Sequence, residues 1–387
     1  MKVVFVSNYL SHHQMPFSLE MAKAEEYYFI ATEPFNKERS KIGYNDLNFK
    51  YPWIVQSYLS DEKKILAEKL INEADVVIYG GFGESLIKNR LNQGKLILRY
   101  YERLYRKGTC ILKFPLRTIK FRKKYRAYKN QYLLCAGAYV AYDFARSRAF
   151  LNRTYKWGYF PEIKEYESVD NLIENKDKNS ILWVGRLIDL KHPEFAVKLA
   201  KRLKEDGYSH KIKIIGTGEM EEYLKSTAKS QNLDNILFLG GLSIEQTREE
   251  MEKSEIFLFT SNKEEGWGAV LNESMNSGCA VVSSHACGAV PFMVKDEENG
   301  LIFESENFED FYNKVKSLID NPSKRKEISK NAYFTIENEW NGKVATQKLL
   351  ELIKEIVKGN EFPNVYSNGV CSKAEIIKDN WYKKKKL

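Results

Sequence analysis

Short apolar runs recur along the chain, and glycine or small polar residues follow most of them. The runs lie at residues 3–7, 28–31, 76–79, 96–100, 132–136, 181–184, 212–215, 236–239, 256–260 and 280–283. Stretches with helical periodicity, such as 195–205, lie between them. Strands that alternate with helices in this way build parallel sheets flanked by helices. We therefore predict an α/β fold whose ligands bind at the carboxyl ends of the strands.

A polar stretch near the middle of the chain divides this pattern into two halves. Residues 162–180 are highly charged and contain few apolar side chains. The chain has 387 residues, which is more than one compact core usually organises. We therefore predict two domains joined by this linker, each with its own parallel sheet.

Other features of the sequence limit the class of protein. The hydrophobic content of 43% is typical of a folded protein, and no apolar run is long enough to span a membrane. The apolar stretch Met1–Val6 is too short for a signal peptide, which favours a cytoplasmic protein. No Asp-x-Asp or Cys-x-x-Cys motif indicates a metal site. We expect reduced thiols at all five cysteines, which are Cys110, Cys135, Cys279, Cys287 and Cys371.

The segment 264–278, EEGWGAVLNESMNSG, carries the most informative motif. Gly266 and Gly268 allow the main chain to approach a ligand closely. The apolar residues after Gly268 begin a helix, whose first amides would face an anion such as a phosphate. Glu265 lies on the loop and Glu273 lies inside the helix, so the first suits a sugar and the second a diol such as ribose. Two solvated acids at a helix start are the plain alternative, but the flanking glycines favour a binding site.

A second motif, Gly185-Arg186-Leu187-Ile188-Asp189-Leu190-Lys191, follows the strand predicted at 181–184. A diphosphate gains negative charge as its bond to a sugar breaks. Arg186 and Lys191 would stabilise that charge without a metal ion. Two exposed cations after a strand often have no such role, but their occurrence together with the acidic motif favours a functional site.

Together these segments resemble the C-terminal half of the family 4 retaining glycosyltransferases, which have the GT-B fold. The matching pieces occur in the family's order: VGRLIDLK at 184–191, IIGTGEM at 214–220, FLGGL at 238–242, EGWGAVLNESMNSG at 265–278 and CGAVPFMV at 287–294. The first half is similar, through VSNYLSHHQMP at 6–16, to members from bacterial capsule and exopolysaccharide gene clusters. The resemblance implies two Rossmann-like domains facing across a cleft. We expect an acceptor-side domain at 1–165, a nucleotide-sugar-binding domain at 166–345, and C-terminal helices at 346–387 that pack back on the first domain.

The resemblance also implies roles for single residues. Arg186 and Lys191 would hold the diphosphate, Glu265 would contact the donor sugar, and Glu273 would contact the ribose. Further contacts with the nucleotide sugar would come from Gly185, Gly216, Gly218, Gly241, Leu242, Gly266, Trp267, Gly268, Ala269 and Val270. The acceptor would attack the face that the diphosphate leaves, and the departing phosphate would take its proton. Neither a protein base nor a metal ion or other cofactor is then expected.

Three further groups of residues follow predicted strands of the first half and are candidates for binding the acceptor or the sugar. His12 and His13 are adjacent, so in an extended segment they cannot both face the same side. We include His12 among the catalytic candidates, whereas the role of His13 stays open. Glu102 and Arg103 suit the same role, although a surface ion pair is an equally good interpretation. Gly80–Gly83 taken alone indicate a turn.

The net charge of +9 is unevenly distributed along the chain. Residues 103–129 carry eleven cations and no acid, with aromatic side chains between them, and four lysines precede Leu387. Such segments suit an anionic membrane surface, where each cation contributes about 1 kcal/mol. A solvated helix face is the plain alternative. Nucleic acid is the third interpretation and is disfavoured, since no recognised binding motif accompanies the charge.

We therefore predict transfer of a sugar from a UDP- or GDP-sugar to a growing, lipid-linked surface polysaccharide. The enzyme would act in the cytoplasm or at the inner face of the plasma membrane, with no nucleic-acid partner. Two alternatives remain open: an epimerase that acts on nucleotide sugars without an acceptor, and a nucleotide-sugar-binding scaffold without catalysis. A NAD-dependent dehydrogenase is disfavoured, because no Gly-x-Gly-x-x-Gly follows the first predicted strand.

Overall fold

The computed structural model describes residues 1–36, 45–81, 83–106, 114–126 and 130–385. Phe82, Cys110, parts of the basic segment 103–129 and the last two residues lie outside the described part of the chain. The chain divides into two compact units. The first unit comprises residues 1–162 and 341–378, and the second comprises residues 163–340 and 379–387.

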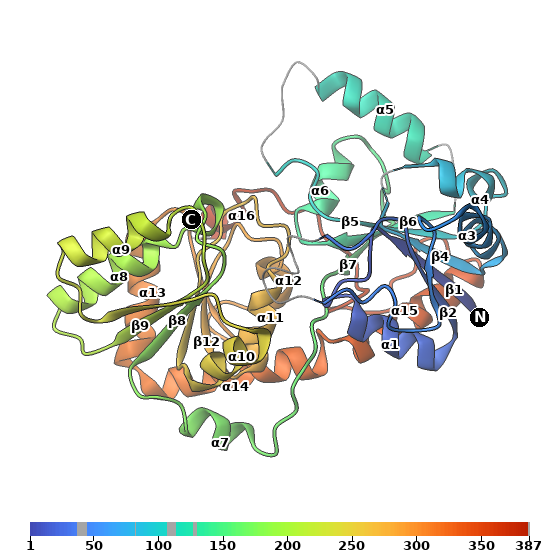
Figure 1. The fold of residues 1–387 in the computed structure, drawn as a ribbon. Helices are drawn as coiled ribbons and strands as arrows, with labels where there is room; N and C mark the ends of the chain where they lie inside the picture. The colour runs from blue at the N-terminus through green and yellow to red at the C-terminus, as the bar shows by residue number, and fades with distance from the viewer. Residues whose placement is uncertain (37–44, 82, 107–113, 127–129, 386–387) are drawn as a thin grey trace. The chain divides into compact units, whose positions relative to one another are not determined.

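The first unit is built on a seven-stranded parallel sheet with the strand order β3-β2-β1-β4-β5-β6-β7. Its strands are β1 (Lys2–Ser7), β2 (Glu26–Ala31), β3 (Ile54–Gln56), β4 (Val76–Tyr79), β5 (Ile97–Tyr101), β6 (Gln131–Ala136) and β7 (Thr154–Trp157). Its helices are α1 (Met15–Ala24), α3 (Asp61–Glu73), η1 (Ser85–Ile87), α4 (Lys88–Asn92), α5 (Phe114–Arg126), α6 (Val140–Ala145) and α15 (Gly342–Val357). Helices cover both faces of this sheet (Figure 1).

Alternation along the buried strands gives the first sheet two apolar faces. Val4 and Val6 of β1 belong to a cluster that includes Leu70 of α3. Phe5, which points to the opposite face, packs edge-on against Phe17 of α1 with their ring centroids 6.2 Å apart. The late helix α15 lies beside α1 (Figure 1). Each of these helices therefore buries one face against the sheet or against a neighbouring helix.

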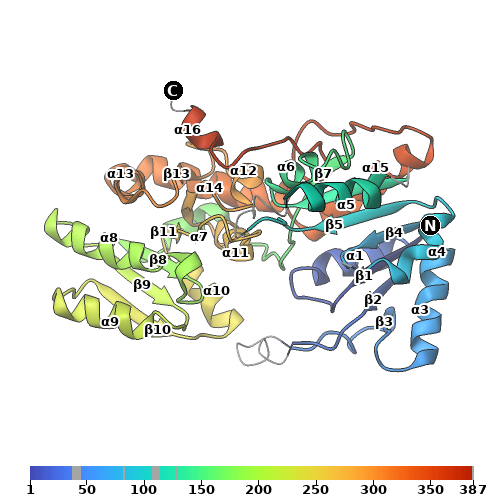
Figure 2. The ribbon, with the colours of Figure 1, turned by 90° about the horizontal axis from the view of Figure 1, so that it is seen from above.

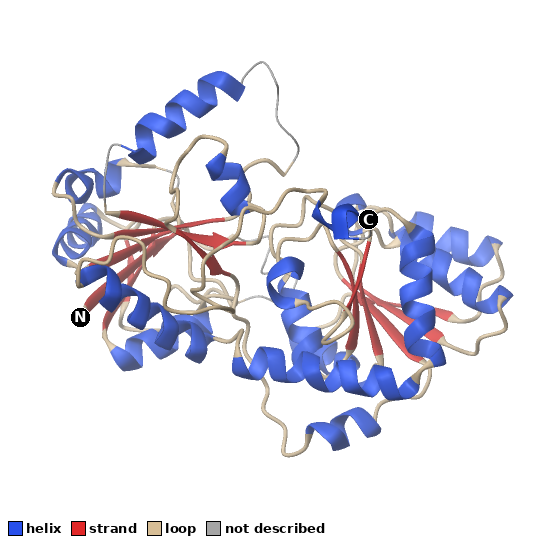
Figure 3. Ribbon diagram, turned by 180° about the vertical axis from the view of Figure 1, so that it is seen from behind, coloured by secondary structure: helices blue, strands red, loops and turns tan. Residues whose placement is uncertain are grey.

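The second unit is built on a six-stranded parallel sheet with the strand order β10-β9-β8-β11-β12-β13. Its strands are β8 (Ser180–Val184), β9 (Lys211–Ile215), β10 (Ile236–Gly240), β11 (Ile256–Phe259), β12 (Ala280–Ser284) and β13 (Leu301–Phe303). Its helices are α7 (Val169–Glu174), η3 (Asp189–Lys191), α8 (Glu194–Glu205), α9 (Glu221–Ser230), α10 (Ile244–Lys253), α11 (Ala269–Asn276), α12 (Val290–Met293), α13 (Phe308–Asp320), α14 (Pro322–Asn338) and α16 (Trp381–Lys385). Figure 2 shows α8 and α9 side by side, and Figure 3 shows helices on both faces of each sheet.

The last residues of the chain require a correction to the predicted domain boundaries. We expected all of 346–387 to pack on the first domain, but residues 379–387 belong to the second unit. There the Tyr382 hydroxyl donates a hydrogen bond to the Ile302 carbonyl at 2.5 Å, and the Tyr382 ring stacks on His285. Lys383 pairs with Glu304 at 2.7 Å. These contacts fix the end of the chain to the strand edge of the second sheet.

The predicted α/β fold with two Rossmann-like domains is confirmed. In each sheet the strand order reverses once, between β1 and β4 in the first unit and between β8 and β11 in the second. Open parallel sheets bind ligands at such reversal points, outside the carboxyl ends of the strands. The topology alone therefore selects two places to search for a site, one in each unit.

Candidate functional site

The loops that follow β8 and β11 are joined by hydrogen bonds at the reversal point of the second sheet. The Trp183 indole N–H donates to the Thr260 hydroxyl at 2.9 Å, and this hydroxyl donates to the Lys191 carbonyl at 2.6 Å. The Asn262 amide donates to the Leu190 carbonyl at 2.9 Å. The two strongest sequence motifs thus meet in space. We call residues 185–191, 260–268 and helix α11 the β8–β11 site.

An ion pair between Lys191 and Glu265 lies at the centre of the β8–β11 site. The Lys191 ammonium donates a hydrogen bond to Glu265, and both side chains are mostly buried, with 15% and 16% exposure. The Ser261 hydroxyl approaches the same carboxylate at 3.4 Å. Arg186 is exposed in the preceding loop, and it forms no ion pair with any described residue. The site therefore holds one positioned cation and one cation free to reorient.

Two predicted glycines, Gly216 and Gly218, pack closely against the main chain of residues 185–187. Gly216 has a φ of +132°, and a Cβ atom there would lie 1.8 Å from the Gly185 carbonyl oxygen. A Cβ at Gly218 would lie 2.4 Å from the Leu187 carbonyl oxygen. Their absent side chains let the loop after β9 donate and accept hydrogen bonds along residues 185–187, as from Leu187 to the Thr217 carbonyl at 2.9 Å. Glycine at these positions is required for packing, whatever further contact it makes with a ligand.

Gly268 begins α11 in a conformation that favours glycine. Its φ is +88°, and a Cβ there would lie 2.3 Å from the Phe259 ring. The first amides of α11, at Ala269 and Val270, have no partner inside the helix, as at every helix start. Such amides, with the positive end of the helix dipole, attract an anion. The β8–β11 site therefore offers both cations and main-chain donors to a negatively charged group.

The side chain of Trp267 lies in the core next to the β8–β11 site and does not line it. Its side chain is 1% exposed, and its indole N–H donates to the Asn272 side chain at 2.9 Å. The indole packs on Trp340 with ring centroids 5.5 Å apart. We predicted Trp267 as a ligand contact, but its burial leaves only its main chain for that role.

Glu273 lies one turn further along α11 and is half-buried. Burial raises the pKa of its carboxyl to about 7, while the positive charge of Arg248 acts in the opposite direction. A carboxylate accepts hydrogen bonds from both hydroxyls of a diol, and those bonds favour its ionised form. Burial therefore disfavours the ionised carboxylate, and hydrogen bonds from a ligand diol would favour it.

Gly241 and Leu242 follow β10, which is the edge strand of the second sheet. Two strand positions separate β10 from β8, which corresponds to about 10 Å. Gly241 is exposed and Leu242 is half-buried. The structure therefore places both at the periphery of the β8–β11 site, where a long ligand extending away from the ion pair would reach them.

Metal-binding geometry is not evident in the described residues, where no group of three or more His, Cys, Asp or Glu side chains is arranged to hold an ion. The four described cysteines, Cys135, Cys279, Cys287 and Cys371, are buried and free of disulfides. Burial raises the pKa of each of these thiols, so they are poor nucleophiles. The described polar groups of the β8–β11 site are its cations, carboxylates, hydroxyls and main-chain amides.

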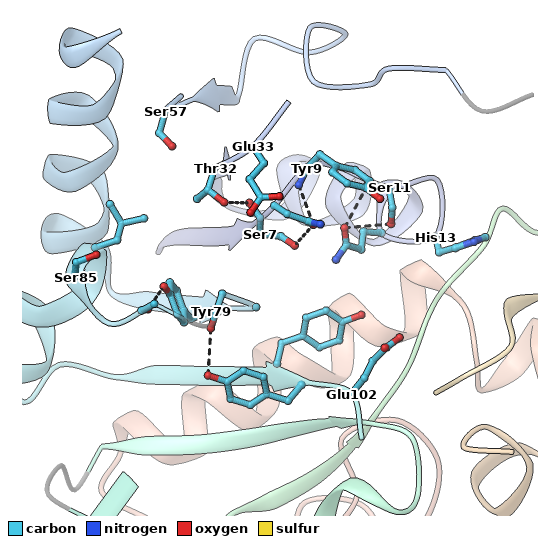
Figure 4. A pocket seen from close by; sticks show the side chains of 18 of the residues that line it. Ser7, Tyr9, Ser11, His13, Thr32, Glu33, Ser57, Tyr79, Ser85 and Glu102 are labelled. Carbon is cyan, nitrogen blue, oxygen red and sulfur yellow. Dashed lines mark hydrogen bonds between the residues drawn. The ribbon is translucent and has the colours of Figure 1, made fainter. Parts of the chain in front are cut away.

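A cavity of about 700 Å³ lies at the reversal point of the first sheet (Figure 4). Its wall comes from the residues that follow β1, β2, β4 and β5, together with Tyr159 beyond β7. Gly80, Gly81, His13 and Glu102, which all follow predicted strands, line it, whereas His12 is not among the lining residues. We call this space the β1–β4 cavity.

A chain of contacts forms the rim of the β1–β4 cavity around Glu102. His13 stacks on Tyr159 with ring centroids 5.6 Å apart and an interplanar angle of 15°. The Tyr159 hydroxyl donates to the Glu102 carboxylate, which also pairs with Arg106. Glu102 is therefore held in a fixed orientation. Arg103 turns elsewhere, since it is buried 3.8 Å from Asp143 and over the ring of Tyr139.

A second ion-pair cluster links the loop after β4, parts of which line the β1–β4 cavity, to the basic helix α5. Arg99 is fully buried and pairs with both oxygens of Glu84, at 3.0 and 2.8 Å. Lys124 of α5 reaches the same carboxylate at 2.6 Å. The loop before Glu84 is further held by the Tyr101 hydroxyl, which donates to the Gly81 carbonyl at 3.2 Å. The sequence did not reveal this cluster, because its members are far apart in the chain.

Helix α5 presents cations and two aliphatic side chains to solvent. Leu116 is 72% exposed and Ile119 is 54% exposed, and Lys120, Arg122 and Lys123 are exposed with them. The opposite side of the helix packs inward through Tyr125, which lies against Phe144 and Phe150. The described part of the chain contains no helix with the length and apolar character needed to cross a bilayer.

Comparison with known proteins finds its sequence matches mainly in the second unit. Residues 165–334 match the family model described as glycosyl transferases group 1. A protein of Methanocaldococcus jannaschii described as an uncharacterized glycosyltransferase is 30% identical over 204 residues, which is 51% of this chain and 51% of the relative. A Campylobacter jejuni protein named N-acetylgalactosamine-N,N'-diacetylbacillosaminyl-diphospho-undecaprenol 4-alpha-N-acetylgalactosaminyltransferase is 34% identical over 152 residues, which is 39% of this chain and 40% of that protein.

The similarity to solved structures extends over most of the chain. The crystal structure of Anabaena Alr3699/HepE in complex with UDP superposes with a TM-score of 0.66 at 13% identity, covering 92% of this chain and 100% of that chain. At this identity the likeness shows the fold alone, which is the predicted GT-B fold. The chain spans about half the length of the first curated relatives it matches. The second unit therefore resembles the group 1 glycosyl transferases through residues 165–334, and the first unit is similar to known proteins through its fold.

Proposed function

We propose that this protein transfers a sugar from a nucleotide-diphosphate sugar to a growing surface glycan, and that the β8–β11 site binds the donor. The observation that carries the proposal is the meeting of Lys191, Glu265 and the start of α11 at the reversal point of the second sheet. A diphosphate fits the cations and amides, and the ribose diol fits Glu273. The named UDP complex of a protein with the same fold supports uridine diphosphate as the carrier, and guanosine diphosphate is the alternative that the sequence left open.

The proposed reaction is metal-independent and retains the configuration of the sugar, as in the family 4 enzymes that the motifs resemble. The bond between the anomeric carbon and the diphosphate oxygen breaks, while the acceptor oxygen bonds to the same carbon from the same face. The acceptor proton passes to the departing phosphate oxygen. Arg186 and Lys191 offset the charge that develops on the diphosphate. Glu265 holds Lys191 in position and faces the sugar, so its own carboxylate orients the reacting ring.

The acceptor is proposed to be a lipid-linked glycan at the inner face of the plasma membrane. Helix α5 supports this part, because its exposed cations and its exposed Leu116 and Ile119 suit an anionic lipid surface. The name of the Campylobacter jejuni relative includes a diphospho-undecaprenol acceptor, which supports the same class for this chain. The first unit, which contains both α5 and the β1–β4 cavity, is then the acceptor side.

Thermal unfolding with a panel of nucleoside diphosphates in EDTA tests the donor site. A nucleotide at about 100 times its dissociation constant adds about 2.7 kcal/mol to stability. We expect one base to stabilise the wild-type protein and to lose its effect in Lys191→Met. Lys229→Met is the matched control, because Lys229 is an exposed lysine of α9 outside the site. Stabilisation that is equal in both variants would place the nucleotide elsewhere.

Flotation with lipid vesicles tests the membrane part separately. We expect the protein to float with vesicles that contain anionic lipid and to remain unbound with neutral ones. Leu116→Ser combined with Ile119→Ser should reduce flotation, whereas Ile65→Ser should not, since Ile65 is a similarly exposed residue of α3. Equal recovery with both kinds of vesicle would remove the electrostatic argument.

A further inference from the structure

The wall of the β1–β4 cavity is made mainly of hydroxyl and aromatic groups. Tyrosine contributes more side chains than any other residue type, including Tyr79, Tyr100 and Tyr159, and short hydroxyl side chains such as Ser7 and Thr32 fill the spaces between them. Figure 4 shows Ser7, Thr32 and Glu33 on one side of this space and Glu102 on another. Aromatic faces pack against the C–H face of a sugar ring, and hydroxyls exchange hydrogen bonds with its edge.

One wall group is a buried polar atom that the protein does not satisfy well. Tyr100 is 8% exposed, and its hydroxyl has no well-formed hydrogen bond among the described residues. Burial raises the pKa of the Tyr100 hydroxyl, and the neighbouring side chains of Tyr159 and Gln14 act on it in the opposite direction. A buried hydroxyl in this condition costs stability unless a ligand or water completes its hydrogen bonds. The Tyr100 hydroxyl is therefore a polar group of the cavity wall whose hydrogen bonds within the protein are incomplete.

The charges around the cavity exclude most anions. Among the described residues that line the cavity, Lys64 is the one lysine or arginine, whereas Glu33 and Glu102 are both carboxylates. The neighbouring cations are already held by acids: Arg106 by Glu102, and Arg99 and Lys124 by Glu84. Glu33 is exposed, and it forms no ion pair with any described residue. An acidic ligand would therefore meet two carboxylates and one exposed lysine in this cavity. The cavity thus differs from the chain as a whole, whose net charge is +9.

We propose that the β1–β4 cavity binds the terminal sugar of the acceptor, and that it selects an uncharged or amino-bearing ring over one that carries a carboxylate. This inference rests on the proposed function and names the class of its acceptor. Glu102, which Tyr159 and Arg106 orient, accepts a hydrogen bond from a ring hydroxyl. Glu33 adds a second acceptor and repels a carboxylate on the sugar. Both act as binding and specificity residues.

The test is saturation-transfer NMR on the full chain with three probes: methyl glucoside, methyl glucosaminide and methyl glucuronide. We expect saturation transfer to the first two, and about tenfold weaker affinity for the glucuronide. Glu33→Gln should reduce the difference in affinity between the glucuronide and the other two probes. The double variant with Glu102→Gln should reduce this difference further. Glu33 is exposed, so its variant should fold normally, and Glu68→Gln on α3 is a matched control outside the cavity.

Stabilisation by nucleoside diphosphate is measured on the same samples. Equal or stronger binding of the glucuronide by the wild-type protein, with the nucleotide effect intact, would overturn the selectivity alone. No saturation transfer to any probe would overturn the assignment of a sugar to the cavity. If no nucleoside diphosphate stabilises the wild-type protein while the preference among the sugars is observed, the result would instead count against the proposed donor site.

Discussion

Replacing Glu273 with glutamine should stabilise the protein at high pH while removing nucleotide binding. The variant keeps the shape of the side chain and removes its charge. In the folded protein burial raises the pKa of Glu273 from an ordinary value of 4.5 to about 7. The folded state therefore holds this proton more tightly than the unfolded state does. The stability that the proton provides is complete below pH 4.5 and is lost as the pH rises through 7.

The expected size of the effect follows from the same values. A pKa raised from 4.5 to about 7 corresponds to about 3 kcal/mol of stability lost by pH 8. Because the side chain keeps some contact with solvent, we expect about 2 kcal/mol. The Glu273→Gln protein has no such loss. Its unfolding free energy relative to the wild type should therefore increase by that amount between pH 4.5 and pH 8.

Urea unfolding followed by tryptophan fluorescence at several pH values measures this difference. Trp183, Trp267 and Trp340 are buried in the second unit, so the signal includes the part of the chain that contains Glu273. Glu222→Gln, at an exposed position of α9, should show no change with pH. The reasoning fails if Glu273→Gln is less stable than the wild type at pH 8, or if the difference between them does not depend on pH.

Three further predictions concern the two sites. Gly268→Ala should destabilise the protein by about 2–4 kcal/mol, measured by the same unfolding assay, because its Cβ would lie 2.3 Å from the Phe259 ring at a positive φ; a neutral result would contradict the described loop. Glu84→Gln should lower the free energy of unfolding by about 2 kcal/mol, since it leaves the buried Arg99 without its bidentate partner. Proteolysis near α5 should then be faster than in the wild type, because Lys124 of α5 also loses its partner. Unchanged cleavage would show that this ion pair does not hold the helix. Lys191→Met should lower kcat by about 100-fold or more, whereas Lys229→Met should leave it unchanged, and equal rates in the two variants would remove Lys191 from the reaction.

The interior of each sheet could be predicted from the sequence, whereas most of the edges could not. The ten apolar runs correspond to strands of the structure, with ends that differ by one or two residues. The three strands that the sequence did not reveal are β3, β7 and β13, and all three lie at sheet edges. They have three or four residues each, and an edge strand needs fewer apolar side chains because it has one neighbour.

The β8–β11 site was accessible to sequence reasoning because each of its motifs is contiguous. One segment, with Arg186 and Lys191, follows β8, and the other, from Glu265 to Glu273, follows β11. The strand order places these two strands side by side. The contact of Trp267 with a ligand stays a prediction, and a tryptophan between two glycines gives no sign of whether its side chain faces the ligand or the core. Its contact with Trp340 depends on the segment between α14 and α15, which comes much later in the chain.

The β1–β4 cavity was only partly visible in the sequence. His13, Glu102 and the glycines at 80–83 follow predicted strands, so they could be suspected, and Phe82 among them lies outside the described residues. Glu33 and Tyr159 carry no motif of their own and join the cavity only through the fold. The division of residues 346–387 between the two units was hidden for the same reason, since the contacts of Tyr382 with the second sheet are long-range.

The most direct measurement follows a labelled sugar from its nucleotide to a lipid. Purified protein is incubated in EDTA with labelled UDP- and GDP-sugars and with membranes that contain lipid-linked glycans. We predict label in the lipid extract with one of the donors, lost in Glu265→Gln and retained in Glu222→Gln. Label that stays in the aqueous phase as an epimerised nucleotide sugar, or lipid labelling that Glu265→Gln leaves unchanged, would contradict the account.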